Sequence, residues 1–85
     1  MIIVYGKPGC PQCDQAKALS QTRGLEYHYI ELDVGQPKKL DGEYISRDDF
    51  MMLFPEARAV PQIVVDDTHV GGIREFQEYL KGQTL

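Results

Sequence analysis

The first five residues, Met-Ile-Ile-Val-Tyr, form an unbroken apolar run that Gly6 ends. A run without alternating polarity is typical of a central strand whose two faces are both covered, because a half-exposed strand alternates. Residues 10–24 follow as a predicted helix, since residues 14–19 are compatible with a helix and Gly24 is a natural C-terminal cap. Residues 25–32 return to strand formers. This order of strand, helix and strand predicts a right-handed parallel crossover.

The middle of the chain predicts a surface loop and a short helix. Residues 33–44 hold almost no apolar side chains and are rich in Gly, Pro, Lys and Asp, so they are expected to form a loop. Ser46 and Asp49 have the spacing of a capping box. Apolar residues then recur at helical spacing until Pro55, which predicts a short amphipathic helix.

The last part of the chain predicts a β-hairpin and a third helix. Residues 62–65 and 68–70 are strand formers that flank a two-residue turn. After two glycines, residues 73–80 carry apolar side chains on one helical face, and this helix ends near Gly82. The predicted fold class is therefore α/β, a four-stranded mixed sheet with three helices in the order β-α-β-α-β-β-α, as a single domain over residues 1–85.

Charge and composition exclude several classes of partner. Nine Lys and Arg against 13 Asp and Glu give a net charge of -4, so the basic surface of a nucleic-acid-binding protein is missing. The longest apolar run is far shorter than the roughly 20 residues that span a bilayer, and the start of the chain does not resemble a signal peptide. Two cysteines are too few for a disulfide-stapled secreted scaffold. We therefore expect a cytoplasmic protein without nucleic-acid or membrane partners.

The sequence Cys-Pro-Gln-Cys at residues 10–13 stands where the first strand passes into the first helix. Cys10 is expected at the helix N-terminus, where free N–H groups and the helix dipole favour a thiolate and lower the pKa from about 8.5 to roughly 3.5–7.5. Lys7 adds positive charge before it. Cys13, three residues later, is expected on the same side and close enough to form a disulfide. We predict that Cys10 is the nucleophile and that Cys13 resolves its mixed disulfides.

Other interpretations of the cysteine pair stay open. It could be half of a zinc site, although His28 and His69 lack the spacing of zinc ligands, so no metal within one chain is expected. Zinc shared between two chains, inert cysteines and a purely structural disulfide are the remaining alternatives. Such a disulfide would close too small a loop to stabilise the chain much.

Three features taken together resemble the glutaredoxin family: the motif at residues 10–13, Val60-Pro61 before the third strand, and Gly71-Gly72 before the last helix. The resemblance covers nearly the whole chain. It implies a thioredoxin fold and a glutathione-disulfide oxidoreductase of the dithiol type, which reduces protein disulfides and glutathione-mixed disulfides with glutathione as co-substrate. It also implies that the bond before Pro61 is cis and that Pro61 lies against the cysteines. Ribonucleotide reductase is a plausible protein partner of such an enzyme, and we expect a monomer.

The resemblance also implies a glutathione groove. The backbone of Val60 would pair with the cysteinyl main chain of glutathione, while the start of the last helix would hold the γ-glutamyl carboxylate. Glu75 would pair with the ligand's ammonium group, and cations would receive the glycyl carboxylate. The residues implied in glutathione binding are Lys7, Gln12, Arg47, Val60, Pro61, Gly72, Arg74 and Glu75.

Two alternatives within the same fold are kept. Gln12 stands where many dithiol members have tyrosine, and Ala59 stands where threonine is usual. These departures keep open a thioredoxin-like disulfide reductant that thioredoxin reductase recycles, as the alternative to the glutathione-dependent enzyme. The other alternative is an iron-sulfur carrier in which Cys10 from two chains and two glutathione thiols hold a cluster, against which Pro11 and Cys13 argue. The tyrosines are expected to be packing or surface aromatics.

Overall fold

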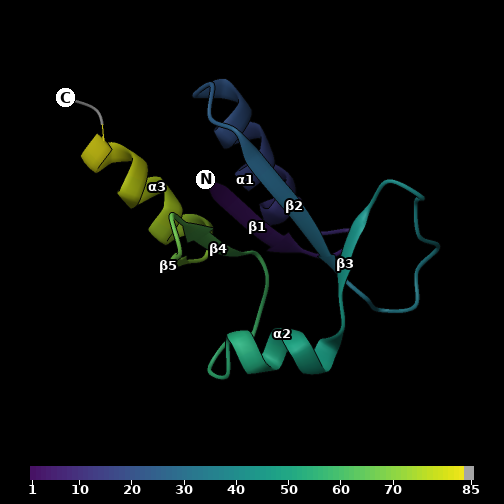
Figure 1. Cartoon of the computed structure of the whole chain (residues 1–85). Coiled ribbons are helices and arrows are strands. Elements are labelled where there is room, and N and C mark those ends of the chain that lie inside the picture. The colour runs from purple at the N-terminus through teal and green to yellow at the C-terminus, as the bar shows by residue number, and fades with distance from the viewer. Residues whose placement is uncertain (84–85) are drawn as a thin grey trace.

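The computed structural model describes residues 1–83. All three predicted helices are present, and within the described residues no helix combines the length and the hydropathy needed to cross a bilayer. Figure 1 shows the elements in chain order: β1 (Ile2–Gly6), α1 (Pro11–Thr22), β2 (Tyr27–Leu32), β3 (Glu43–Ile45), α2 (Arg47–Leu53), β4 (Gln62–Val65), β5 (Thr68–Gly71) and α3 (Ile73–Gln83).

β1 lies at the centre of a mixed sheet with the strand order β3-β2-β1-β4-β5. It pairs in parallel with β2 and antiparallel with β4, which confirms that the apolar run at the start of the chain is a central strand. β4 and β5 form the predicted antiparallel hairpin. Its turn places Asp66 and Asp67 at positive φ angles of 50° and 67°, which Asp tolerates better than most residues.

The prediction of four strands is wrong by one, because β3 adds a fifth strand at the edge of the sheet. β3 pairs in parallel with β2, with Glu31 opposite Tyr44 and Leu32 opposite Ile45. The predicted surface loop, residues 33–44, therefore extends too far, because Glu43 and Tyr44 belong to β3. A three-residue strand is too short to show a period in its side chains, and its backbone pairing with the edge of β2 leaves no mark on the sequence.

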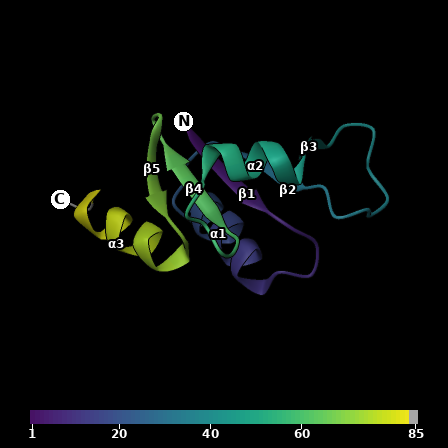
Figure 2. The same cartoon turned by 90° about the horizontal axis from the view of Figure 1, so that it is seen from below.

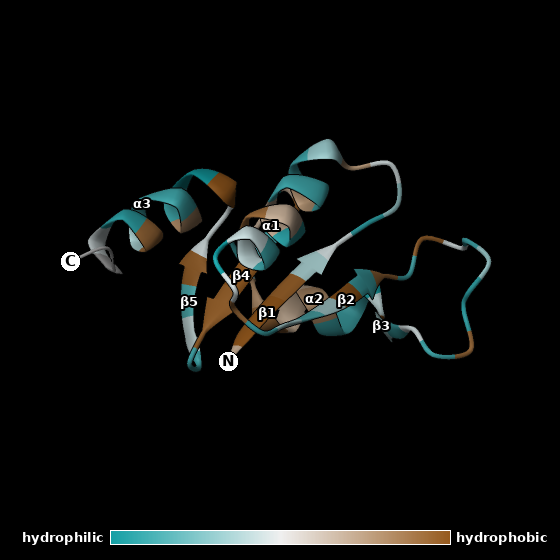
Figure 3. Cartoon of the chain, turned by 90° about the horizontal axis from the view of Figure 1, so that it is seen from above, coloured by the Kyte–Doolittle hydropathy of each residue, from teal (hydrophilic) through white to brown (hydrophobic). Residues whose placement is uncertain are grey.

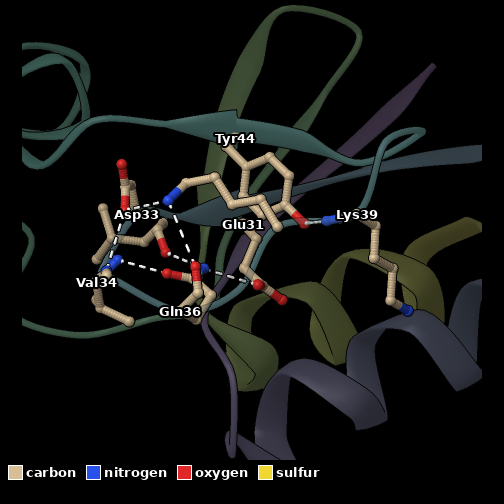
Figure 4. Close-up of polar contacts among 9 residues, drawn as sticks. Glu31, Asp33, Val34, Gln36, Lys39 and Tyr44 are labelled. Atoms are coloured by element: carbon tan, nitrogen blue, oxygen red, sulfur yellow. Dashed lines mark hydrogen bonds and ion pairs between the residues drawn. The ribbon is translucent and has the colours of Figure 1, made fainter.

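The loop between β2 and β3 is held by polar contacts of its own side chains (Figure 4). The amide of Gln36 donates to the Glu31 carboxylate at 2.8 Å and to the Leu32 carbonyl at 2.9 Å. The backbone N–H of Lys39 donates to the Tyr44 hydroxyl at 2.8 Å. These bonds give an extended loop a fixed shape without an apolar core.

The two faces of the sheet carry different cores. Figures 1 and 2 show α1 and α3 on one side of the sheet and α2 on the other. Along β1 the side chains alternate, so Ile2 and Val4 pack against Phe76 of α3 while Tyr5 packs against Phe50 of α2. Figure 3 shows hydrophobic colour concentrated in β1 and β4. Coverage of both faces explains why β1 is apolar at every position before its glycine.

Candidate active site

Cys10 is the N-cap of α1, at the end of the loop that leaves β1. Its backbone is extended, with φ -114° and ψ 100°, and Pro11 begins the helix where no N–H is needed. The backbone N–H of Cys13 donates to Cys10 Sγ at 3.1 Å. The predicted placement of Cys10 at the helix N-terminus is therefore confirmed.

The two cysteines form a disulfide, with their Cα atoms 5.2 Å apart. Cys10 keeps 8% of its surface exposed, whereas Cys13 is fully buried at 0%. A nucleophile arriving from solvent therefore reaches the sulfur of Cys10 more readily than that of Cys13. This asymmetry fits the different roles that the sequence predicts for the two residues.

The peptide bond between Val60 and Pro61 is cis, as the resemblance implies. Pro61 is buried just before β4. The carbonyl oxygen of Val60 lies 3.9 Å from Cys10 Sγ. The segment before β4 thus borders the disulfide, and Val60 is in place to meet a peptide attached to Cys10.

A cationic groove of about 340 Å³ lies beside this segment. Lys7, Arg47 and Val60 line it together. Two cations expected near the glycyl carboxylate are thus brought to the residue whose backbone is expected to pair with the ligand. Arg58 also lines the groove, and the sequence analysis misses this residue. The sequence does contain a sign of this role. Arg58 stands two residues before Val60, so its guanidinium can reach a carboxylate of a peptide that pairs with the Val60 backbone.

A second groove, of about 510 Å³, lies on the other side of the same segment. Gly72 and Glu75 line it, and it shares Ala57, Arg58 and Ala59 with the cationic groove. The Gly72 N–H donates to Glu75 Oε1 at 2.8 Å. The two grooves therefore flank residues 57–59, with cations at one end and a helix start with a carboxylate at the other.

Two residues implied in glutathione binding lie elsewhere. Gln12 is exposed on the first turn of α1 and is not among the residues that line either groove. Arg74 lines a separate cavity with Leu19 and Arg23, between α3 and the end of α1. Adjacent residues of a helix point in directions about 100° apart, so Arg74 and Glu75 serve different surfaces.

Tyr29 lies next to the disulfide, although the sequence analysis treats it as an ordinary packing aromatic. A Cβ atom on Gly6 would lie 2.6 Å from the Tyr29 hydroxyl oxygen and 2.9 Å from Cys13 Sγ. Burial raises the pKa of Tyr29 to about 12, and the charges of Glu31 and Asp14 add to this shift. The hydroxyl therefore stays protonated near neutral pH. A tyrosine in β2 carries no motif that points to the cysteines, so only the fold reveals this contact.

Metal ligands do not gather around the cysteines. Among residues 1–83, no group of three or more His, Cys, Asp and Glu side chains is arranged to hold a metal ion. His28 pairs instead with Glu43 at 3.3 Å, and His69 contacts Gln62 at 2.7 Å.

The comparisons with known proteins agree with this geometry. The family model for glutaredoxin matches residues 2–70. Glutaredoxin 1 of Salmonella typhimurium is 32% identical over 84 residues, which cover 93% of this chain and 88% of that protein. The structure of reduced Escherichia coli glutaredoxin is 28% identical with a TM-score of 0.69, and the match covers 95% of this chain and 93% of that one. A buckwheat glutaredoxin–glutathione complex is 26% identical with a TM-score of 0.70, covering 99% of this chain and 71% of that one.

The chain shares the thioredoxin fold of these neighbours. In this chain, helices cover both faces of a mixed sheet and the cysteine pair lies at the start of α1. The family model covers residues 2–70, from the start of β1 into β5, and this range contains both cysteines, Val60 and Pro61. The chain therefore belongs to the glutaredoxin family.

Proposed function

We propose that this chain is a glutathione-dependent thiol-disulfide oxidoreductase that reduces protein disulfides and glutathione-mixed disulfides. The main support is the position of Cys10, which lies at a helix N-terminus, keeps more exposed surface than Cys13, and borders Val60, a residue that lines the cationic groove. A helix start favours a thiolate, and the 3.1 Å hydrogen bond from the Cys13 N–H stabilises negative charge on Cys10.

The proposed reduction of a protein disulfide proceeds in two exchanges. The Cys10 thiolate attacks one sulfur of the substrate, and the other substrate sulfur leaves as a thiolate with the bonding electron pair. The Cys13 thiol passes its proton to the substrate thiolate just released and attacks Cys10, which closes the Cys10–Cys13 disulfide and releases the second substrate thiolate. Two glutathione molecules then reduce this disulfide in two further exchanges and leave as glutathione disulfide.

Glutathione is proposed to lie along residues 57–60, across both grooves. Its main chain would pair with the Val60 backbone, which borders Cys10 Sγ. Its glycyl carboxylate would lie in the cationic groove with Lys7, Arg47 and Arg58. Its γ-glutamyl end would reach the second groove, which supplies the start of α3 and the Glu75 carboxylate. The buckwheat relative is itself a glutathione complex, which supports this choice of ligand.

The cellular setting forms part of the proposal. A dithiol that must return to the reduced state after each turnover suits a reducing compartment, so the cytoplasm is proposed as its location. Ribonucleotide reductase is proposed as one protein substrate, on the resemblance alone, and the chain is proposed to act as a monomer without a metal.

A second candidate is a disulfide reductant that thioredoxin reductase recycles. The contact between Gly72 and Glu75 favours it, because this hydrogen bond occupies a backbone donor that a glutathione carboxylate would use. A carboxylate next to an incoming carboxylate also repels it. Both candidates use the same cysteine chemistry and differ only in the electron source.

The deciding experiment measures NADPH oxidation with hydroxyethyl disulfide as substrate. One reaction contains glutathione and glutathione reductase, and the other contains thioredoxin reductase without glutathione. Turnover that depends on glutathione and its reductase is the expected result. Turnover with thioredoxin reductase alone would replace the proposed function with the second candidate, while the family and fold would stand.

A further inference from the structure

The side chains of Tyr29 and Cys13 both approach Gly6 at the end of β1. The three atoms nearest to a Cβ on Gly6 would be Oη and Cε1 of Tyr29, at 2.6 and 2.7 Å, and Sγ of Cys13, at 2.9 Å. Only a residue without a side chain leaves space for both groups at this point. A tyrosine hydroxyl from β2 is thereby brought next to the buried half of the disulfide.

Cys13 needs a hydrogen-bond donor once the disulfide opens. Its side chain is fully buried, so water does not reach a sulfur that has just received the bonding electron pair. Its own backbone N–H is directed to Cys10 Sγ at 3.1 Å. A buried anion without a partner is costly, and the neighbouring hydroxyl of Tyr29 is a group that can donate to it.

The Tyr29 hydroxyl is free to change its partner. It donates to the Lys7 carbonyl at 3.4 Å, which is long compared with the usual 2.5–3.0 Å of a hydroxyl hydrogen bond. Little free energy is therefore lost when the hydroxyl turns toward Cys13.

The ring of Tyr29 packs against a cation of α1 and lies near acidic groups of two elements. Lys17 of α1 lies over the ring, with its Nζ 4.1 Å from the centroid, and it pairs with Asp14 at 3.5 Å. Glu31 of β2 and Asp14 are the acidic groups that raise the pKa of this tyrosine further, after burial. The ring is thus fixed while the hydroxyl hydrogen can rotate.

We propose that Tyr29 is a positioning residue whose hydroxyl donates a hydrogen bond to the Cys13 sulfur in the reduced protein. A reductant thiolate attacks Cys10 Sγ, the bond between the two cysteine sulfurs breaks, and its electron pair goes to Cys13 Sγ. The hydroxyl stabilises this thiolate until it takes up a proton from a reductant thiol. The role depends on the cysteine pair and not on glutathione as the reductant.

The test compares the full-length wild type with Tyr29→Phe and Tyr27→Phe. Each protein is equilibrated with mixtures of reduced and oxidised dithiothreitol at a series of pH values, and the reduced fraction is measured by thiol trapping and mass spectrometry. Tyr27 is the matched control, because it lies in the same strand but its hydroxyl accepts from Gln21 at 3.2 Å. Circular dichroism and thermal unfolding verify that each variant is folded.

Loss of the hydroxyl should lower the equilibrium constant for reduction about two- to tenfold, the range of one hydrogen bond. Of the two inflections that the two thiols give, the one at higher pH should move further up, because the Cys13 thiolate has lost its donor, while the one that belongs to Cys10 should stay. Tyr27→Phe should match the wild type. An unchanged constant and inflection in folded Tyr29→Phe, or an equal change in Tyr27→Phe, would overturn the proposal.

A second variant covers the case in which Tyr29→Phe does not fold. Replacement of Tyr29 by 3-fluorotyrosine keeps the ring and strengthens the hydroxyl as a donor. The equilibrium constant should then move toward the reduced protein. A shift toward the disulfide, or no shift, would contradict the proposed hydrogen bond. Because dithiothreitol is the reductant, this result is independent of whether glutathione binds.

Discussion

Gly72 donates its backbone N–H to the carboxylate of Glu75 at 2.8 Å. Glu75 therefore caps the start of α3, where the first helical bond is the one from Phe76 to the Gly72 carbonyl. The N–H groups before that bond are the donors that a helix start offers to an anion. The Gly72 N–H among them already bonds to Glu75, an acidic residue of the same helix. A ligand at this place therefore meets N–H donors and also a negative charge.

Glu75→Gln should show whether the charge of Glu75 attracts the ammonium group of glutathione or repels its carboxylate. The amide oxygen can still accept from Gly72, but the charge that would bind the γ-glutamyl ammonium is removed. We expect the KM for glutathione to rise about two- to tenfold with little change in kcat. Glu78→Gln in the same helix, away from both grooves, is the matched control. A lower KM would instead identify Glu75 as a competitor of the ligand.

Serine replacements should assign different roles to the two cysteines. Cys10→Ser removes the nucleophile, so turnover of protein disulfides and of glutathione-mixed disulfides should both be abolished. Cys13→Ser should still turn over glutathione-mixed disulfides, because glutathione itself can attack the intermediate on Cys10. The assay is NADPH oxidation with glutathione reductase. Activity without Cys10 would show that the more exposed sulfur is not the attacking one.

Arg58→Gln should weaken the cationic groove. Because Arg58 is exposed, loss of its charge should raise the KM for glutathione about two- to fivefold, and added salt should reduce the difference. The same change at Arg74 tests the expectation from the sequence, and the separate cavity of Arg74 predicts a smaller effect. An equal rise in KM for both variants would indicate that the bound ligand extends around α3.

The sequence predicts elements well where one residue type has one local role. Cys10 at a helix start, Ser46 as an N-cap and the apolar run of β1 each follow from local chemistry, and each is confirmed. β3 could not be predicted, because its three residues are held by backbone pairing with β2. Such pairing depends on where the loop returns and not on the residue types.

The residues of the candidate site also divide into those that the sequence predicts and those that only the fold reveals. The positions of Cys10, Cys13 and Val60 follow from the order of elements. Tyr29 is an ordinary packing residue in the sequence, and only the fold brings it near the disulfide, because contacts between elements far apart in the chain are absent from any local pattern. Arg58 differs, because its place two residues before Val60 already puts it near the cationic groove.

Gly6→Ala should lower the free energy of unfolding and disturb the surroundings of the Cys13 sulfur. The added methyl group would lie 2.6 Å from the Tyr29 hydroxyl oxygen and 2.9 Å from Cys13 Sγ, so one of these side chains must move. Overpacking of this kind costs about 1–3 kcal/mol. Gly82→Ala is the control, because nothing lies within 4 Å of its added Cβ. Urea unfolding that leaves Gly6→Ala as stable as the wild type would refute the close approach.

Alkaline titration should isolate Tyr29 from the other tyrosines. The pKa of Tyr29 is raised from 10.0 to about 12, first by burial and then by Glu31 and Asp14. In the unfolded chain this hydroxyl ionises near pH 10, so its contribution to stability is complete below that pH and is lost as the pH rises toward 12. Tyr29→Phe should remove one tyrosine from the latest phase of the ultraviolet titration, while Tyr5, whose pKa burial also raises, still ionises late. The free energy of unfolding of Tyr29→Phe should also fall less steeply above pH 10 than that of the wild type. Equal late phases in both proteins would mean that Tyr29 is open to water and is not packed over Gly6.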